Sequence, residues 1–171
     1  MARHIELNPV NHLTIGTVGE PGNRTFYLQG GRGAQIVTLT IEKEQARTLA
    51  GSFETLLAEL EQKYQLETPK EESVWTDLRL RDPIESLFRV GNMGLGYNEE
   101  SDQIVLVAYE LVREEDIEPN VVSYWATREQ AQALVRHAMD VVKAGRPICG
   151  NCGRPIDPDG HFCPHRNGHA H

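Results

Sequence analysis

The stretch from Gln35 to Leu60 decides the fold, because it changes from the periodicity of a strand to that of a helix. It reads QIVTLTI over residues 35–41 and EKEQARTLAGSFETLLAEL over residues 42–60. The first part is rich in β-branched residues, which favour a strand. In the second part apolar residues recur at steps of three and four, which predicts one apolar stripe on a helix that lies on a sheet. The stripe consists of Ala46, Leu49, Ala50, Phe53, Leu56, Leu57 and Leu60.

Two more strands are expected before this stretch. Residues 12–18 alternate apolar and polar side chains, which is typical of a half-buried strand. The turn residues at 19–23 reverse the chain, and residues 24–29 then read as the returning strand. The sequence GGRG at 30–33 predicts a second turn. Together these elements predict a β-β-β-α unit over about residues 10–65.

The second half of the chain repeats this order. Strands are expected over 89–97, 103–112 and 121–126, with a hairpin turn at 98–102 and an acidic loop at 114–120. Thr127 and Gln130 form a capping box, which predicts the start of a helix that ends at Gly145. A second β-β-β-α unit is therefore predicted over about residues 86–145.

The two units resemble each other when they are aligned with an offset of 85 residues. The matches are Ile36-Val37 with Val121-Val122, Glu44-Gln45-Ala46 with Glu129-Gln130-Ala131, and Leu49 with Leu134. We interpret these matches as an internal duplication. The expected fold class is α+β, with two tandem β-β-β-α units forming antiparallel sheets that two helices cover. An acidic connector over 66–85 joins the units, so that the duplicated body spans 1–145 and a zinc-knuckle tail spans 146–171.

Composition and charge narrow the class of protein. The chain has 171 residues, a formal net charge of −8 and three cysteines, all in the tail. Because phosphate backbones are bound mainly by Lys and Arg, this charge disfavours a nucleic-acid partner. The longest apolar run, residues 104–109, is too short for a membrane span, and the N-terminus has no apolar signal region. An odd number of clustered cysteines does not make a disulfide framework, so we expect a protein of the reducing cytoplasm.

The tail carries the clearest chemical motif, CGNCGRPIDPDGHFCPHRNGHAH over residues 149–171. Cys149 and Cys152 have the spacing of a zinc knuckle, and the turn at 158–160 returns the chain so that Cys163 can face them. The fourth ligand is His161, which leaves the turn opposite the knuckle, or alternatively His165. A site closed by three thiolates and one imidazole has no vacant position for catalysis, so the expected cofactor is a structural zinc ion.

Other motifs favour structural roles. Gly16, Gly19 and Gly22 resemble a phosphate-binding loop, but no helix follows them, and a hairpin turn explains them better. The aromatic residues Trp75, Trp125, Tyr97 and Tyr124 either line a pocket or belong to the core, and core aromatics are the more frequent case. We find no Ser-His-Asp, paired-carboxylate or nucleotide-binding arrangement, so no catalytic residue is assigned.

Several stretches resemble an uncharacterised bacterial domain-of-unknown-function family of similar length. They are residues 16–29, 42–45 and 88–91 and the C-terminal CxxC...HxC tail, so that the resemblance covers nearly the whole chain. The resemblance implies no catalytic residues. It favours His161 as the fourth zinc ligand, because that family has a histidine at this position and more often has arginine where His165 stands.

Two functions are compatible with these features. The first is a binding or adaptor module in which a structural zinc supports a recognition surface that includes Arg154 and Arg166, with an unknown protein as partner. The second is an enzyme or enzyme subunit that acts on a small anionic substrate between the two repeats, near the loop from Gly19 to Arg24.

Overall fold

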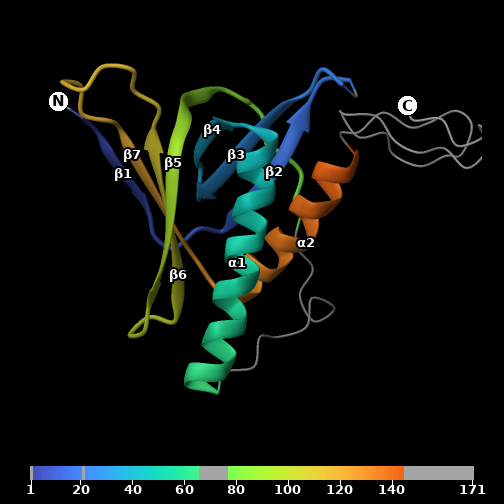
Figure 1. Ribbon diagram of the computed structural model, residues 1–171, viewed down its shortest axis with the longest axis vertical. Coiled ribbons are helices and arrows are strands. Elements are labelled where there is room, and N and C mark those ends of the chain that lie inside the picture. Colours follow the sequence, from blue (N-terminus) through green and yellow to red (C-terminus); the bar gives the residue numbers. More distant parts are fainter. Residues whose placement is uncertain (1, 21, 66–76, 145–171) are drawn as a thin grey trace, which may run out of the picture.

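The computed structural model describes residues 2–20, 22–65 and 77–144, and these residues form an α+β fold (Figure 1). The elements are β1 (His4–Leu7), β2 (His12–Val18), β3 (Thr25–Arg32), β4 (Gln35–Ile41), α1 (Lys43–Tyr64), β5 (Ser86–Asn98), β6 (Gln103–Glu110), β7 (Val121–Ala126) and α2 (Arg128–Ala144). Neither of these two helices is long and apolar enough to cross a membrane.

The strands form one seven-stranded sheet in the order β1-β7-β6-β5-β4-β3-β2. The sheet is mixed. β2-β3-β4 and β5-β6-β7 are antiparallel, as expected, whereas the parallel pairs β4-β5 and β1-β7 were not expected. β4 and β5 are parallel. In the sequence α1 follows β4 and precedes β5, and it returns the chain to the end of the sheet where β4 begins. β1 is also parallel to its neighbour β7. No strand is predicted over His4–Leu7 from the sequence pattern, because a four-residue edge strand has too few residues to show a period.

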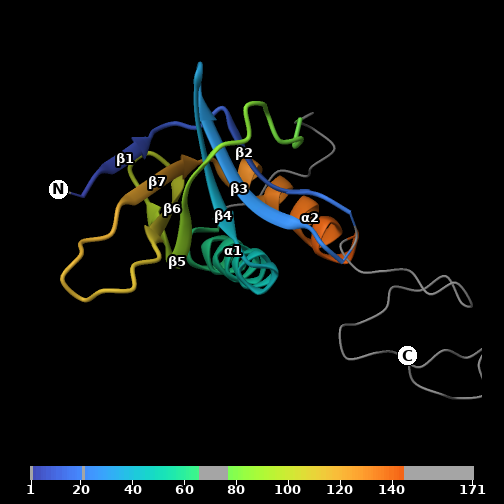
Figure 2. The same cartoon turned by 90° about the horizontal axis from the view of Figure 1, so that it is seen from above.

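The long strand β5 connects two parts of the sheet, which we call wings. One wing consists of β2, β3 and β4, and the other consists of β6, β7 and β1. Its first part pairs with β4 through Ser86 and Arg89, and its second part pairs with β6 from Val90 to Asn98. The register shifts between Val90 and Asn92, around Gly91, where the strand leaves β4. Figure 2 shows the two wings inclined to each other, with α1 and α2 packed on the same side.

The wings meet in the core through Tyr124 of β7 and Gly30 of β3. A Cβ atom on Gly30 would lie 2.3 Å from Tyr124 Cδ1, so only glycine leaves room for this ring. The Tyr124 hydroxyl donates a hydrogen bond to the Val37 carbonyl at 3.3 Å, and Tyr124 is fully buried. This aromatic residue is therefore part of the core and does not line a pocket.

The same contact corrects the turn that was expected at residues 30–33. β3 continues through Gly30 and Gly31 to Arg32, which pairs with Gln35, and the reversal is confined to Gly33 and Ala34. Gly33 has a φ of 61°, as a tight turn requires. The glycine at position 30 serves close packing between strands and not chain reversal.

Both predicted helices are confirmed, and so is the apolar stripe of α1. On α1, Ala46, Leu49, Ala50, Phe53, Leu57 and Leu60 are buried, and Leu56 packs at the margin of the core. On α2, Ala131, Leu134, Ala138 and Val142 are buried. α2 packs against α1 and against β2, so that the two helices cover the apolar face of the β2-β3-β4 wing.

The two helices begin in the same way. The Glu42 N–H donates to Gln45 Oε1 at 2.8 Å, and the Thr127 N–H donates to Gln130 Oε1 at 2.8 Å. Each glutamine then uses its Nε2 amide to reach a neighbouring segment: Gln45 donates to the Val90 carbonyl, and Gln130 donates to the Val10 carbonyl. Gln45 therefore also attaches α1 to β5, and Gln130 attaches α2 to the connection between β1 and β2.

Candidate binding groove

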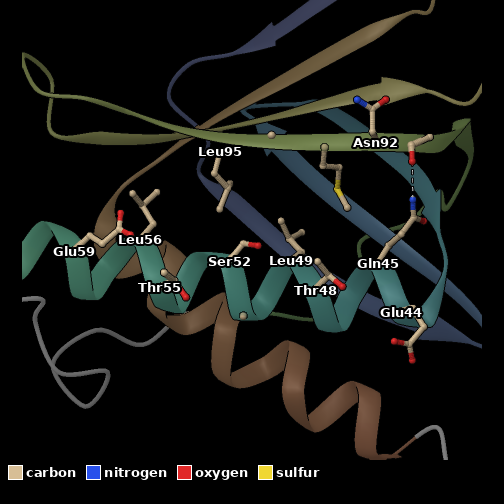
Figure 3. A pocket seen from close by; sticks show the side chains of 14 residues that line it. Glu44, Gln45, Thr48, Leu49, Ser52, Thr55, Leu56, Glu59, Asn92 and Leu95 are labelled. Carbon is tan, nitrogen blue, oxygen red and sulfur yellow. Dashed lines mark hydrogen bonds between the residues drawn. The ribbon is translucent and has the colours of Figure 1, made fainter.

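A groove of about 800 Å³ lies between α1 and the second part of β5 (Figure 3). This volume is within the range of sites that bind ligands. Its lining comes from Glu44, Gln45, Thr48, Leu49, Gly51, Ser52, Thr55, Leu56 and Glu59 on α1 and from Gly91, Asn92, Met93, Gly94 and Leu95 on β5. The groove thus lies between elements of the two predicted units, and no residue of the 19–24 loop lines it.

The wall formed by α1 is polar and exposed. Thr48, Ser52 and Thr55 follow one another at steps of four and three, so their hydroxyl groups share one face of the helix. Gly51 lies on this face, and no atom lies within 4 Å of where its Cβ would be. Three hydroxyl groups and an open position beside them can accept a ligand without any shift of the core.

The wall formed by β5 is apolar. Met93 and Leu95 pair with Ala108 and Leu106 of β6, whose side chains are buried on the inner face of the sheet. Met93 and Leu95 therefore point to the same side, and Figure 3 shows Leu95 pointing toward α1 while Asn92 points away. Both side chains are only partly buried, so they leave apolar surface at the bottom of the groove.

The groove also exposes a strand edge. β4 pairs with β5 only as far as Arg89, and Gln45 Nε2 then donates to the carbonyls of Val90 and Gly91 at 3.1 and 3.2 Å. Within the described part of the chain, no strand pairs with residues 92–98 on the side away from β6. We call this side of residues 92–98 the open edge of β5.

The charges in the groove do not form a catalytic arrangement. Its ionisable lining residues are Glu44 and Glu59, which lie 15 positions apart on α1 (59 − 44), or about 22 Å at the rise of a helix. Glu44 is paired with Arg47 at 2.8 Å, and both side chains are solvent-exposed. Two carboxylates this far apart cannot act together as acid and base on one bond.

A second polar cluster lies under the segment 77–83, on the face of the β2-β3-β4 wing opposite the helices. His12 Nε2 lies 3.0 Å from Gln29 Oε1, and the Gln29 amide donates to Thr38 Oγ1 and to the Arg81 carbonyl. The Arg81 N–H donates to Gln29 Oε1 at 2.7 Å, and the Thr14 hydroxyl donates to the Leu78 carbonyl at 2.6 Å. Burial lowers the pKa of His12, and its hydrogen bond to Gln29 opposes that shift. This cluster attaches a backbone segment to the sheet.

A third cluster joins the β5-β6 turn to α2. The Tyr97 hydroxyl donates to Asp102 Oδ1 at 2.7 Å, and Arg128 makes a two-point ion pair with the same carboxylate. The hydrogen bond from Arg128 holds the pKa of Asp102 below its usual value, whereas burial raises the pKa of Tyr97 to about 12. Since every polar group in it is paired, we assign it a structural role.

The zinc ligands predicted from the sequence are Cys149, Cys152, His161 and Cys163, with His165 as the alternative. All five lie outside the described residues, and so does Trp75. Over residues 2–20, 22–65 and 77–144, no group of three or more His, Cys, Asp or Glu side chains is arranged to hold a metal ion. The zinc site in the tail therefore remains a prediction.

The groove was not among the predicted sites. One signal in the sequence points to it: Thr48, Gly51, Ser52 and Thr55 interrupt the exposed side of α1 with small residues, where Glu, Lys and Arg are the usual choice. The other wall depends on where β4 separates from β5, and that separation has no signature within β5 itself.

A family model described as "Protein of unknown function (DUF3090)" matches residues 5–163. No curated protein and no solved structure matches the chain.

Proposed function

The chain belongs to the DUF3090 family, whose function is unknown, and we propose from the geometry that it is a binding module for a polypeptide segment of a partner protein. The segment occupies the groove between α1 and β5. This proposal keeps the first of the two functions expected from the sequence and moves the recognition surface from the tail to the body.

The observation that supports it is the combination of three features in one groove. Hydroxyl groups on α1 can hydrogen-bond to a ligand, Met93 and Leu95 offer apolar contact, and the open edge of β5 offers main-chain groups. A polypeptide presents all three complementary features at once. Glu44 and Glu59 do not form a catalytic pair, so we favour binding over the enzymatic alternative.

Gly51 permits a direct test. A library of random heptapeptides displayed on phage is selected on the full-length protein, and the enriched peptides are measured by calorimetry. Gly51→Leu fills the groove from the exposed side of α1, whereas Gly51→Ala adds only one methyl group and is the matched control. We expect Gly51→Leu to weaken binding by about tenfold or more and Gly51→Ala to leave it nearly unchanged. Peptides that bind both variants equally, or the absence of any enriched peptide, would contradict the proposal.

We further propose that the tail holds a structural zinc ion through Cys149, Cys152, His161 and Cys163, with His165 as the alternative fourth ligand. The support is the spacing and the ligand types, which are those of closed tetrahedral sites. Metal analysis of the purified protein should find about one zinc per chain, and Cys152→Ser should lose it. Comparison of His161→Ala with His165→Ala identifies the fourth ligand. A full-length protein without zinc would disprove this part of the proposal.

We also propose that the two units arose by duplication, and that the protein works in the cytoplasm. The duplication is supported by Gln45 and Gln130, which lie 85 positions apart (130 − 45). Each accepts a hydrogen bond from the N–H three positions earlier, and each donates from Nε2 to a main-chain carbonyl outside its own helix. The cytoplasmic location is supported by the clustered, odd number of cysteines.

A further inference from the structure

We propose that the partner segment binds as an added β-strand on the open edge of β5, and that it carries basic residues at its ends. This inference rests on the proposed function and specifies the conformation and chemistry of the ligand. It follows from the direction of the main-chain groups, the length of the groove and the position of its charges.

The hydrogen-bond pattern of the sheet indicates which groups face the groove. The Glu110 N–H donates to the Asn120 carbonyl on the β7 side, so the main-chain groups of its neighbour Tyr109 point to β5. Tyr109 pairs with Asn92, whose N–H and C=O therefore point to β6. Successive residues of a strand direct their main-chain groups to opposite sides. The N–H and C=O groups of Met93 and Leu95 therefore point to the open edge.

These groups have no protein partner in the described part of the chain. Gln45 donates to the carbonyls of Val90 and Gly91, and among the described residues no main-chain group bonds to Met93 or Leu95 from that side. A row of unpaired main-chain groups beside a helix is what an extended peptide requires in order to add to a sheet. Gln45 closes one end of this row, so the added strand begins next to it.

The dimensions of the groove suit a short strand. The stretch of α1 from Glu44 to Glu59 is about 22 Å long. An extended chain rises about 3.3 Å per residue, so the groove holds six or seven residues. Every second side chain of such a strand would point into the groove. There it would contact Met93 and Leu95 of β5 and Leu49 and Leu56 of α1, so apolar residues are favoured at these positions of the peptide.

The charged residues of the groove indicate which residues the bound segment carries near its ends. Glu44 and Glu59 lie near the two ends of the α1 wall, and they are the charged residues among those that line the groove. The chain as a whole has a formal charge of −8, which attracts a basic partner and repels an acidic one. Lys or Arg near each end of the segment is therefore favoured, with the exposed Glu59 as the stronger contributor, because Glu44 is already paired with Arg47.

Leu95 allows a test of strand addition. Because its N–H points away from β6, proline at this position removes a donor from the open edge and leaves the β5-β6 ladder intact. Leu95→Ala removes the same apolar side chain and keeps the N–H, so it is the matched control. The probes are the heptapeptides enriched on the wild-type protein and their analogues with N-methyl groups at single positions.

We expect Leu95→Pro to bind these peptides at least about tenfold more weakly than Leu95→Ala. N-methyl groups should abolish binding at alternate peptide positions and be tolerated between them. If Gly51→Leu blocks binding but the two Leu95 variants bind equally, the groove remains the site and strand addition is wrong. Circular dichroism is used to check that both variants are folded. A concentration-dependent dimer that Leu95→Pro abolishes would assign the edge to a second copy and overturn the inference.

Discussion

The side-chain amide of Gln45 donates a hydrogen bond to the Val90 carbonyl at 3.1 Å, at the place where β4 stops pairing with β5. One residue thus caps α1, attaches it to the sheet and marks the end of the open edge. Gln130 caps α2 in the same way and is bonded to the Val10 carbonyl at 3.0 Å.

Replacing Gln45 with glutamate tests this attachment. The carboxylate of Gln45→Glu can still accept from the Glu42 N–H, but it cannot donate to the Val90 and Gly91 carbonyls. We expect the free energy of unfolding to fall by about 1–2 kcal/mol, because the hydrogen bonds to both carbonyls are lost and oxygen atoms then face each other. Urea denaturation measures the change. Glu44→Gln, on the exposed side of the same turn, is the control, and equal stability of the two variants would contradict the assigned role.

Gly30→Ala tests the contact between the two wings. The added methyl group would lie 2.3 Å from Tyr124 Cδ1, and the ring cannot move without disturbing the core. The expected cost is about 1–3 kcal/mol in the free energy of unfolding, as for other overpacked cores. Gly96→Ala is the control, since no atom lies within 4 Å of a Cβ there. Should the two variants unfold at the same urea concentration, the Tyr124 ring does not pack on β3 as described.

Gly51→Ala should stabilise the protein. Gly51 lies within α1, has open space where its Cβ would be, and costs a helix interior about 1 kcal/mol relative to alanine. A rise in the free energy of unfolding of about 0.5–1 kcal/mol is expected from thermal denaturation. A loss of stability would mean that Gly51 is required for folding, and it would weaken the interpretation that this glycine keeps the groove open.

Stability should decrease below neutral pH, in part because of His12. Burial lowers the pKa of His12 in the folded protein, so the unfolded chain takes up a proton first as the pH falls. The contribution of His12 is fully present above its unfolded pKa of about 6.5 and is lost as the pH falls through the lower pKa of the folded state. Burial lowers the pKa of His137 too, and it adds to the same trend.

The variant His12→Gln separates the two histidines. It should reduce the difference in the free energy of unfolding between about pH 7.5 and about pH 5.5, although it is less stable at the higher pH. His4→Gln changes an exposed histidine and is the control. A pH dependence that is the same in all three proteins would show that His12 does not carry the effect.

Local pattern was sufficient to predict much of the fold. The apolar stripe of α1, the capping box at Thr127 and the strands over 12–18, 35–41 and 121–126 all follow from residues close together in the chain, and the structure confirms them. The direction of β5 relative to β4, the strand β1 and the role of Gly30 depend on contacts between distant residues. Gly30 in particular looks like a turn glycine beside Gly31, and only Tyr124, 94 positions later (124 − 30), explains it.

The candidate site was harder to predict than the fold. Cysteine and histidine spacing is a local signal, so it directed attention to the tail, which lies outside the described residues. The groove arises because β5 extends beyond β4 while α1 runs alongside it. That arrangement exists only after the sheet has formed, and the residues that line it, such as Thr48 and Met93, are individually ordinary.

Hydrogen exchange of individual amides tests the central claim most directly. The full-length protein is measured by NMR with and without a heptapeptide selected on it. Strand addition predicts that the amides of Met93 and Leu95 exchange about tenfold more slowly or better when the peptide is bound, whereas those of Gly94 and Gly96, which already face β6, change little. Binding that leaves the amides of Met93 and Leu95 unprotected would contradict the proposal that the groove adds a strand to β5.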